Sequence, residues 1–393
     1  MKKTFMGYKR ANGTVGVRNH VAVIPAVFCA NKTARWISER VPGTIYLNHA
    51  VGCAQVGLDL EFTARTLCAA GRHPNVAAVL VVGLGCERFK PEELYEAVKA
   101  AGKPVEMVVV QDEGGTTGAV NKGAKLLEKL VKTQENTTRE PCDISSLMIA
   151  TKCGGTDATS GLAANPALGA MCDMLTARGG SAILSELNEL IGTEHVLAKR
   201  AVDEAVAKDI YDAVYEVEER LKNGCDDRYP ERNHLISPGN FDGGVSSIVE
   251  KALGGIHKSG SSQFVGVLPY ATPPEAGRRG LFLMNSDSHD GEVVTGMAGC
   301  GAQICCFTTG RGNPTGFPFA PVIKITGNDF TYNMMKENFD FNAAGIISDN
   351  VSVEEMGGRL FELVMRVAQG EETAAEAIGA DELFCVARRF RER

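Results

Sequence analysis

The sequence contains no run of 18 apolar residues and no excess of positive charge. A membrane-spanning helix needs about 20 predominantly apolar residues, so no transmembrane segment is expected. Lys and Arg number 41 against 48 Asp and Glu, a formal net charge of −7, whereas nucleic-acid-binding domains normally present a basic face. The first ten residues contain no apolar core of signal-peptide length. We therefore expect a cytoplasmic protein that binds neither membrane nor nucleic acid.

Two common cofactor motifs are also missing. The 12 cysteines include no pair in C-x-x-C spacing, which excludes a zinc ribbon and a thioredoxin-type motif. The stretch Gly83-Leu84-Gly85 supplies two glycines of G-x-G-x-x-G, but Arg88 stands where the third belongs. Without this fingerprint the pyrophosphate of a dinucleotide has no glycine-rich turn to bind, so we expect no NAD.

Short apolar runs alternate with helical stretches along the chain. Val76–Gly83 lacks polar alternation, as strands buried on both faces of a parallel sheet do. This alternation predicts βαβ units, so the expected fold class is α/β, with two Rossmann-like domains built on mostly parallel sheets. The polar segment Thr133–Pro141 is the best linker candidate and divides the chain into domains 1–135 and 142–393. A long helix is expected over His195–Lys222, and Cys225–Pro238 is a second loop-like segment.

Candidate ligands for a metal stand just after several of the expected strands. Ligands of open α/β sheets bind beyond the carboxyl ends of the strands, and thiolates, imidazoles and carboxylates there could bind a divalent metal. Each cysteine alone is more often a small buried hydrophobe, as we expect for Cys300, Cys305 and Cys306. The cysteine spacings do not match a ferredoxin motif, so the sequence neither indicates nor excludes an iron–sulfur cluster. The candidate metal ligands are His49, Cys53, Cys86, Glu87 and Cys153.

Candidate substrate-binding residues lie on glycine-rich turns and near helix starts. Arg311 stands between two glycines, and a guanidinium there can bind a carboxylate through two parallel hydrogen bonds. The turn after Lys152 leads into a helix whose N-terminus favours an anion. Arg18 and Asn19 precede the first expected strand, where a structural role is equally open. The candidate substrate-binding residues are Arg18, Asn19, Asp157, Ser160, Asn165, Asn240, Arg311 and Asn313.

Candidate catalytic groups are carboxylates, histidines and one lysine. Glu186 and Glu189 are three residues apart, so they would share one face of a helix, and paired carboxylates with a nearby histidine suit acid–base work. The segment Asn285–Glu292 holds three carboxylates and one histidine. Solvated faces or surface turns explain both patterns equally well. The candidate catalytic residues are Lys152, Glu186, Glu189, His195, His289 and Asp290.

Taken together, these motifs resemble the catalytic region of the altronate dehydratase and galactarate dehydratase family. The matching stretches run from residue 7 to about 330 and include GYKRANGTVGVRNHV, HAVGCAQVG, VVGLGCE, KCGGTDATSGLAANPALG, SELNELIGTEH, SPGNFDGGVSSIVEKALGGIHKSGS and FTTGRGNPTG. The residues that fall on motif positions are His49, Cys53, Cys86, Glu87, Cys153, Asp157, Glu186, Glu189, Asp290 and Arg311.

The resemblance implies a lyase that removes water from an aldonic or aldaric acid and yields a 2-keto-3-deoxy acid. It implies a divalent metal, Fe²⁺ first and Mn²⁺ second, a small hydroxy-acid substrate, and a homo-oligomer. Family members begin with a small SAF domain, and this chain starts at the GYKRANG motif, so we expect a small SAF-domain subunit in trans. The same split organisation resembles the large subunit of (2R)-sulfolactate sulfo-lyase, which eliminates sulfite instead of water and gives pyruvate.

Two readings from other classes remain. A non-catalytic subunit that only binds a sugar acid would have apolar residues where this chain has polar ones at the strand ends. A nucleotide-binding dehydrogenase lacks its glycine fingerprint. In the lyase reading, a base takes the C2 proton, an acid or metal assists departure from C3, and a Lewis acid with an arginine stabilises charge on the carboxylate.

Overall fold

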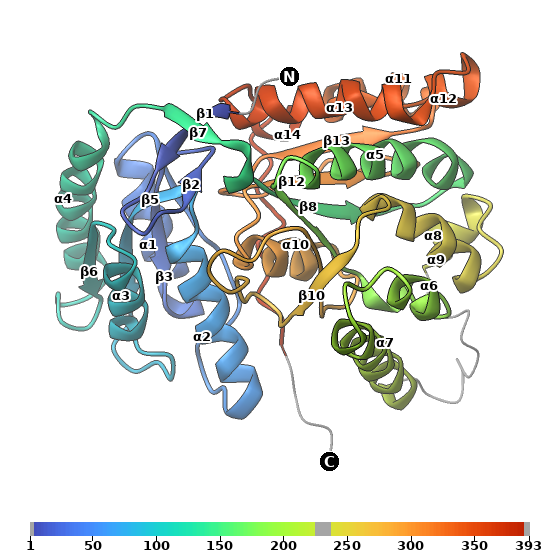
Figure 1. The fold of residues 1–393 in the computed structure, drawn as a ribbon. Coiled ribbons are helices and arrows are strands. Elements are labelled where there is room, and N and C mark those ends of the chain that lie inside the picture. The colour runs from blue at the N-terminus through green and yellow to red at the C-terminus, as the bar shows by residue number, and fades with distance from the viewer. Residues whose placement is uncertain (1–3, 225–236, 389–393) are drawn as a thin grey trace.

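The computed structural model describes residues 4–224 and 237–388, which form two parallel sheets with helices packed against both faces (Figure 1). This α/β architecture with large parallel sheets confirms the predicted fold class. The four-stranded sheet has the order β4-β3-β5-β6. Its strands are β3 (His20–Pro25), β4 (Thr44–Tyr46), β5 (Val76–Gly83) and β6 (Val105–Val109).

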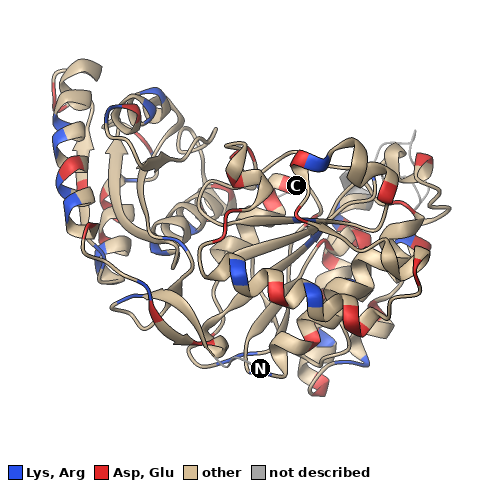
Figure 2. Ribbon diagram, turned by 90° about the horizontal axis from the view of Figure 1, so that it is seen from above, with Lys and Arg blue, Asp and Glu red and all other residues tan. Residues whose placement is uncertain are grey.

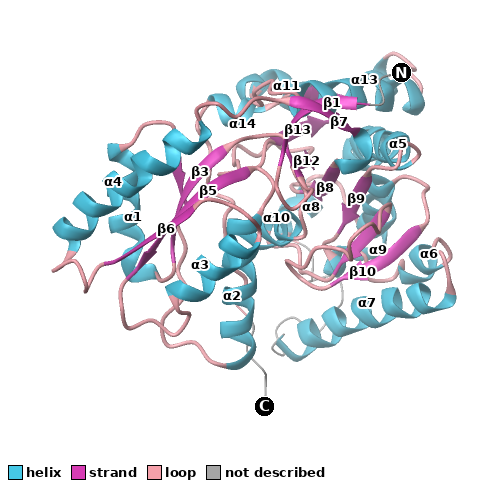
Figure 3. Cartoon of the chain, turned by 60° about the vertical axis from the view of Figure 1, so that its left-hand side comes forward, coloured by secondary structure: helices cyan, strands magenta, loops and turns pink. Residues whose placement is uncertain are grey.

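Helices cover both faces of the four-stranded sheet (Figure 3). On one face, α1 (Asn31–Arg40) packs with α4 (Thr116–Gln134), and on the other α2 (Gly57–Arg72) packs with α3 (Pro91–Ala100). All eight residues of β5 are buried, as its continuous apolar run predicts. Helix α1 connects β3 to β4 on one side of β3, and α2 connects β4 to β5 on the other side. The direction in which successive strands are added therefore reverses between β3 and β5.

The seven-stranded sheet is also parallel, with the order β10-β11-β9-β8-β12-β13-β14. Helices α5 and α13 pack together on one face, and α10 contacts β8 and β12 from the other. Strand β8 has β9 on one side and β12 on the other, which makes the β8–β12 gap a second reversal point. The elements are β8 (Met148–Cys153), β9 (Ser181–Leu184), β10 (Phe264–Leu268), β11 (Leu281–Met284), β12 (Ile304–Thr308), β13 (Val322–Thr326), β14 (Phe341–Asn342), α5 (Asn165–Thr176), α10 (Asp290–Gly299) and α13 (Val353–Ala368).

Shorter helices complete the second half of the chain. The short α8 and α9 carry the polar segment that faces the carboxyl edge of the seven-stranded sheet, and α7 packs against the edge strand β10. The bounds are α6 (Glu194–Ala198), α7 (Glu204–Gly224), α8 (Pro238–Asp242), α9 (Ile248–Ile256), α11 (Asp329–Met334), α12 (Gly345–Ser348) and α14 (Ala374–Ala377), with a 3₁₀ turn η6 (His257–Ser259) after α9.

A small antiparallel sheet joins the N-terminal strand to the segment that connects the two larger sheets. Strand β1 (Thr4–Lys9) pairs with both β2 (Val15–Gly16) and β7 (Glu140–Asp143). The predicted linker Thr133–Pro141 therefore begins inside α4 and ends inside β7, because its last residues complete a sheet with the N-terminal strand. The domain limits 1–135 and 142–393 stay a prediction.

Arg18 and Asn19 belong to the same structural junction. The Arg18 guanidinium pairs with Glu376 at 2.7 Å and donates to the carbonyl oxygens of Val17, Val367 and Glu371. Asn19 accepts a 2.7 Å hydrogen bond from Arg10. Both residues lie at the amino end of β3, opposite the edge where ligands bind, and these internal contacts favour their structural alternative; the substrate-binding role stays a prediction.

The two sheets share one apolar core. A single cluster runs from Val79 and Val81 in β5, through α2 and α10, to Phe282 and Phe307 in the larger sheet. Polar contacts also join the halves: the Asn75 amide donates to the carbonyl oxygens of Gln303 and Phe319 at 2.9 Å each. The shared core therefore fixes the position of the carboxyl edge of one sheet relative to that of the other.

One helix prediction was wrong in detail. The expected helix His195–Lys222 is two helices, α6 and α7, separated by a segment that bridges to Phe264. Helix α10 was not predicted: its glycines lower helix propensity, and burial between α2 and the larger sheet stabilises it. Most of the loop predicted at Cys225–Pro238 lies outside the described residues.

The distribution of charge matches the composition. Acidic and basic residues are interspersed along the ribbon of the outer helices (Figure 2). In the described part of the chain, we find no helix with the length and apolar character needed to cross a bilayer.

Close packing between α5 and η6 gives a test of the fold. A Cβ on Gly169 would lie 2.0 Å from the carbonyl oxygen of His257, so Gly169→Ala is expected to destabilise the protein by about 1–3 kcal/mol through overpacking. Gly255→Ala in α9, where a Cβ meets nothing within 4 Å, is the control and should be neutral or slightly stabilising. Thermal unfolding compares the two; equal melting temperatures would contradict this packing.

Candidate active site

A cavity of about 410 Å³ opens at the carboxyl edge of the seven-stranded sheet. It lies where β8, β9 and β11 end, beside the reversal point between β8 and β12. Such points are where open α/β sheets bind their ligands. The lining residues are Cys153, Gly154, Gly155, Glu189, Ser237, Asn240, Lys251, Ser288, His289 and Asp290.

Beneath the cavity, Glu186 is completely buried between two buried lysines. One carboxylate oxygen pairs with Lys152, and the other pairs with Lys258 and accepts a 3.0 Å hydrogen bond from the Cys153 amide. Glu186 has a left-handed backbone with φ of 71°, a conformation that costs a non-glycine residue about 1–3 kcal/mol. This backbone follows directly after β9 and directs the carboxylate to the two ammonium groups.

The three buried groups stay charged at neutral pH. Burial raises the pKa of Glu186, but the ammonium groups of Lys152 and Lys258 outweigh burial and hold it at about 2. Burial lowers the pKa of Lys152, whereas Glu186 and Asp290 raise it further, and the net shift is upward. The pKa of Lys258 is raised in the same way by Cys153 and Glu186 against burial. Neither Glu186 nor Lys152 is therefore a ready proton acceptor, although both are candidate catalytic residues from the sequence.

Further ion pairs extend this network to the cavity wall. Lys152 Nζ lies 2.8 Å from Asp290 Oδ1, and Asn313 donates to the other oxygen of Asp290 at 3.3 Å. On the opposite side, Lys251 Nζ lies 3.2 Å from Glu189 Oε1. The Cys153 thiol donates to Glu189 Oε2 at 3.3 Å and accepts from Lys258 at 2.9 Å. Lysines and carboxylates thus alternate from Lys251 through Glu186 to Asp290.

Cys153, Glu186 and Glu189 form one of two groups in the described residues whose donor atoms approach closely enough to bind a metal. This group does not fit a cation, because three ammonium groups already occupy its carboxylates. Burial and the neighbouring glutamates also raise the pKa of Cys153 to about 12, and a thiol binds a metal as the thiolate. The metal-ligand role predicted for Cys153 therefore disagrees with its surroundings.

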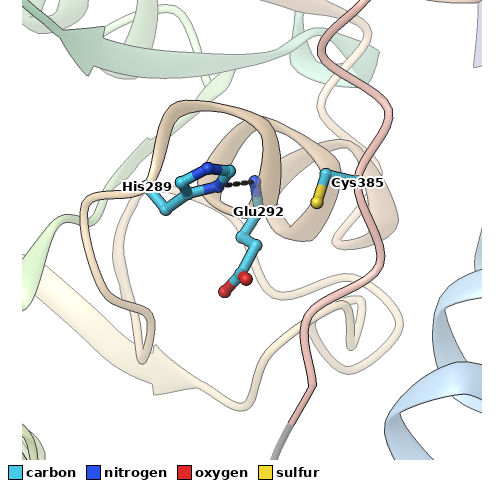
Figure 4. Close-up of side chains that lie close together, drawn as sticks. All are labelled: His289, Glu292 and Cys385. Atoms are coloured by element: carbon cyan, nitrogen blue, oxygen red, sulfur yellow. Dashed lines mark hydrogen bonds between the residues drawn. The ribbon is translucent and has the colours of Figure 1, made fainter. Parts of the chain in front are cut away.

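The second group is His289, Glu292 and Cys385 (Figure 4). His289 is the N-cap of α10, and its Nδ1 accepts a 3.4 Å hydrogen bond from the Glu292 amide. Helix capping therefore explains why these two residues are close. Burial raises the pKa of the Cys385 thiol, and the Glu292 carboxylate adds to the effect. The donor types suit a transition metal, but nothing else in this group points to one.

The remaining predicted metal ligands lie on the other sheet. His49 is buried; its Nε2 donates to the Pro25 carbonyl at 2.7 Å, and its Nδ1 accepts from the Val51 amide at 3.3 Å. Both ring nitrogens are therefore occupied, which contradicts a ligand role for His49. Glu87 is buried and accepts from the amides of Leu84 and Gly85, so it shapes its own loop. Cys53 and Cys86 are exposed.

Of the predicted substrate-binding residues, Asn240 reaches the cavity and Asn313 contacts its wall. Asp157 accepts hydrogen bonds from Thr159, Ser160 and Asn328. Asn165 bonds to Gly254 and Thr308 inside the packing of α5. Internal hydrogen bonds thus already engage Asp157, Ser160 and Asn165, and they do not line the cavity.

Arg311 and His195 also stand outside the cavity lining. Both side chains are exposed, Arg311 on the loop after β12 and His195 on α6. The Arg311 backbone amide donates to Gly155 at 3.1 Å, which places its loop beside the turn after β8. The roles predicted for both residues stay predictions.

Lys251 and Lys258 are the functional residues that sequence reasoning missed. They lie seven residues apart in the apolar segment SIVEKALGGIHKSGS, and both are buried. Residues seven apart share one face of a helix, and lysine is almost never fully buried unless paired. Two lysines on the apolar face of a predicted helix were the available signal.

The buried network predicts a specific acid sensitivity. Glu186→Gln should destabilise the protein by about 3–5 kcal/mol, because it leaves two buried ammonium groups without their shared anion. Since the folded-state pKa of Glu186 is depressed from 4.5 to about 2, its stabilisation is complete above pH 4.5 and is lost as pH falls towards 2.

Melting temperatures across pH 3–7 test this expectation. The gap between wild type and Glu186→Gln should narrow as pH falls, whereas Glu354→Gln on the exposed face of α13 should match wild type throughout. A gap that stays constant down to pH 3 would contradict the charged network.

Comparison with known proteins covers nearly the whole chain. Residues 7–135 match the family model described as D-galactarate dehydratase/Altronate hydrolase, second domain, and residues 144–390 match D-galactarate/Altronate dehydratase, C-terminal.

Named relatives agree with these models. The chain is 37% identical to the (2R)-sulfolactate sulfo-lyase subunit beta of Chromohalobacter salexigens, over 96% of this chain and 95% of that protein. It is 34% identical to the altronate dehydratase of Bacillus subtilis, over 94% and 74%, and 33% identical to the galactarate dehydratase (L-threo-forming) of Escherichia coli, over 94% and 73%. The cavity and its charged network therefore belong to a lyase, and the chain is a member of the D-galactarate/altronate dehydratase family.

Proposed function

We propose that the cavity removes a proton from C2 of a 2-hydroxy acid and expels a group from C3, which yields a 2-keto acid. The observation that carries this proposal is the run of alternating lysines and carboxylates that ends at the cavity wall. Negative charge develops on the substrate carboxylate when the C2 proton leaves, and preorganised positive groups stabilise such charge. Lys251 lines the cavity, where its ammonium group can bind that carboxylate.

Asp290 and His289 are the proposed proton-transfer groups. Asp290 is a carboxylate of the cavity wall, 38% exposed and oriented by Lys152, so it can accept the C2 proton. Because His289 Nδ1 accepts the Glu292 amide, a neutral ring carries its proton on Nε2. That N–H can donate a hydrogen bond to a C3 hydroxyl, and the proton that Asp290 has taken from C2 can pass to this oxygen as the C–O bond breaks. The products are water and an enol, which becomes the 2-keto-3-deoxy acid on tautomerisation.

We propose an aldonic or aldaric acid as the substrate, with water as the leaving group. Hydroxide is a poor leaving group and needs a proton, which protonated Asp290 can return while His289 donates a hydrogen bond to the same oxygen. Lys152, Glu186 and Lys258 then hold the catalytic pair in place and do not exchange protons themselves. Since neither compact donor group is an unambiguous metal site, no step of this mechanism passes through the divalent metal that the resemblance implies.

Elimination of sulfite from (2R)-sulfolactate is the second candidate. The length match favours it: this chain spans almost all of the relative that is named a sulfo-lyase subunit, and about three quarters of the named dehydratases. Here the C3–S bond breaks with its electron pair on sulfur, and the enol becomes pyruvate. Either assignment is compatible with a small partner subunit in trans and a homo-oligomeric assembly, which we also propose.

An anaerobic assay with iron(II) and a panel of aldonates, aldarates and sulfolactate tests the proposal. We expect 2-keto acid formation without NAD. His289→Gln should lower kcat by about 10²–10⁴-fold, the usual contribution of general acid–base catalysis. The matched control is His257→Gln, an exposed histidine outside the cavity lining, which should keep wild-type kcat.

The products decide between the candidates. Keto acid with no sulfite from a sugar acid supports the dehydratase, whereas sulfite and pyruvate from sulfolactate select the sulfo-lyase. An unchanged kcat in His289→Gln with a sugar acid would remove the role proposed for His289.

A further inference from the structure

Three cysteines are exposed at one edge of the four-stranded sheet. Of the 11 cysteines in the described residues, Cys29, Cys53 and Cys86 are exposed, and the other eight are buried or half-buried. Free cysteine is ordinarily among the most buried residue types, and an exposed thiol is open to oxidation. Three exceptions gathered in one region therefore need a chemical explanation.

The three cysteines follow three adjacent strands. Strand β3 pairs with β4 on one side and β5 on the other, and neighbouring strands lie about 4.8 Å apart. Cys29, Cys53 and Cys86 stand in the loops after β3, β4 and β5 respectively. Because all three strands are parallel, these loops lie at the same carboxyl edge.

Hydrogen bonds hold the three loops against one another. The Phe28 amide, beside Cys29, donates to the Val51 carbonyl at 2.8 Å. The Arg88 amide, two residues after Cys86, donates to the carbonyl of Gly52, beside Cys53, at 3.2 Å. The loop after β4 therefore contacts the loops after β3 and β5, in both cases immediately next to the cysteines.

Buried polar side chains fix the shape of each loop. His49 joins the β4 loop to the Pro25 carbonyl at the end of β3, and Glu87 binds two amides of the β5 loop. Gln55 accepts the Gly52 amide at 2.7 Å. Gly52 has φ of 98°, and a Cβ there would lie 2.4 Å from the Ala26 carbonyl oxygen, so only glycine allows this approach. The cysteines thus project from a preorganised frame.

The place in the fold is one where ligands bind. Strand order reverses between β3 and β5, and open α/β sheets bind ligands beyond the carboxyl ends of the strands at such a point. Cys29 and Cys86 flank that point. The cavity at Cys153 occupies the corresponding position on the seven-stranded sheet. The protein therefore has two carboxyl edges with a reversal point, and each edge carries a different set of side chains.

We propose that Cys29, Cys53 and Cys86 bind an iron–sulfur cluster, each thiolate holding one iron. Thiolates are the preferred ligands of iron–sulfur clusters. A cluster of several irons is larger than a single ion, so its ligands can come from three separate loops without approaching as closely as the donors of a mononuclear site. Three thiolates on a four-iron cluster leave the fourth iron open to an oxygen ligand.

Anaerobic purification, or reconstitution with ferrous iron and sulfide, tests the site without substrate. We expect wild type to hold iron and acid-labile sulfide in similar amounts and to show the broad visible absorption of a cluster. Cys29→Ser, Cys53→Ser and Cys86→Ser should each lose most of the iron and sulfide. Cys153→Ser and Cys385→Ser, from the two compact donor groups, are the matched controls and should keep both.

Differential labelling of wild type covers the case in which a variant fails to fold. Loading the cluster should protect Cys29, Cys53 and Cys86 from iodoacetamide, as read by mass spectrometry. Iron without sulfide, equal labelling of the three cysteines in loaded and unloaded protein, or loss of iron on Cys385→Ser alone would overturn the proposal. Keto-acid formation is measured separately, so failure of the cluster leaves the proposed elimination standing.

Discussion

The shared carboxylate of Glu186 is the constraint on which the active-site region depends. Burying one anion between two lysines is tolerable only if the three charges meet directly, because an unpaired charge in the interior costs several kcal/mol. The requirement fixes the end of β9, the end of β8 and the turn η6 relative to one another. Those same segments carry Glu189, Cys153 and Lys251 to the cavity, so the buried network sets the geometry of the exposed one.

Two carboxyl edges of the same protein carry different chemistry. The edge of the seven-stranded sheet has alternating ammonium and carboxylate groups, which suit binding of an anionic acid and proton transfer. The edge of the four-stranded sheet has three exposed thiols on hydrogen-bonded loops. The C-terminal segment connects the two regions: Cys385 packs against Gly291 near the first edge, and Arg388 pairs with Asp59 of α2 at 2.9 Å.

The sequence placed the fold and the important loops with little error. Strand β5 was expected at its observed bounds, because its apolar pattern is long and uninterrupted. Roles within the loops were harder to predict. His49 and Glu87 carry typical metal-binding groups, but hydrogen bonds to their own loops use the atoms a metal would need. Cys29 was not considered, since nothing in a linear sequence places it beside Cys53 and Cys86.

Composition and periodicity were sufficient to determine the α/β class and the parallel sheets, because these depend on local patterns of burial. The strand-end motifs carried the resemblance to sugar-acid lyases. Which groups share a site was decided by tertiary structure alone. Lys258 lies 72 residues from Glu186 in sequence, and its ammonium group both neutralises that carboxylate and excludes a cation from the place where one was expected. Charge pairing of this kind depends on distance in space, which the order of residues does not contain.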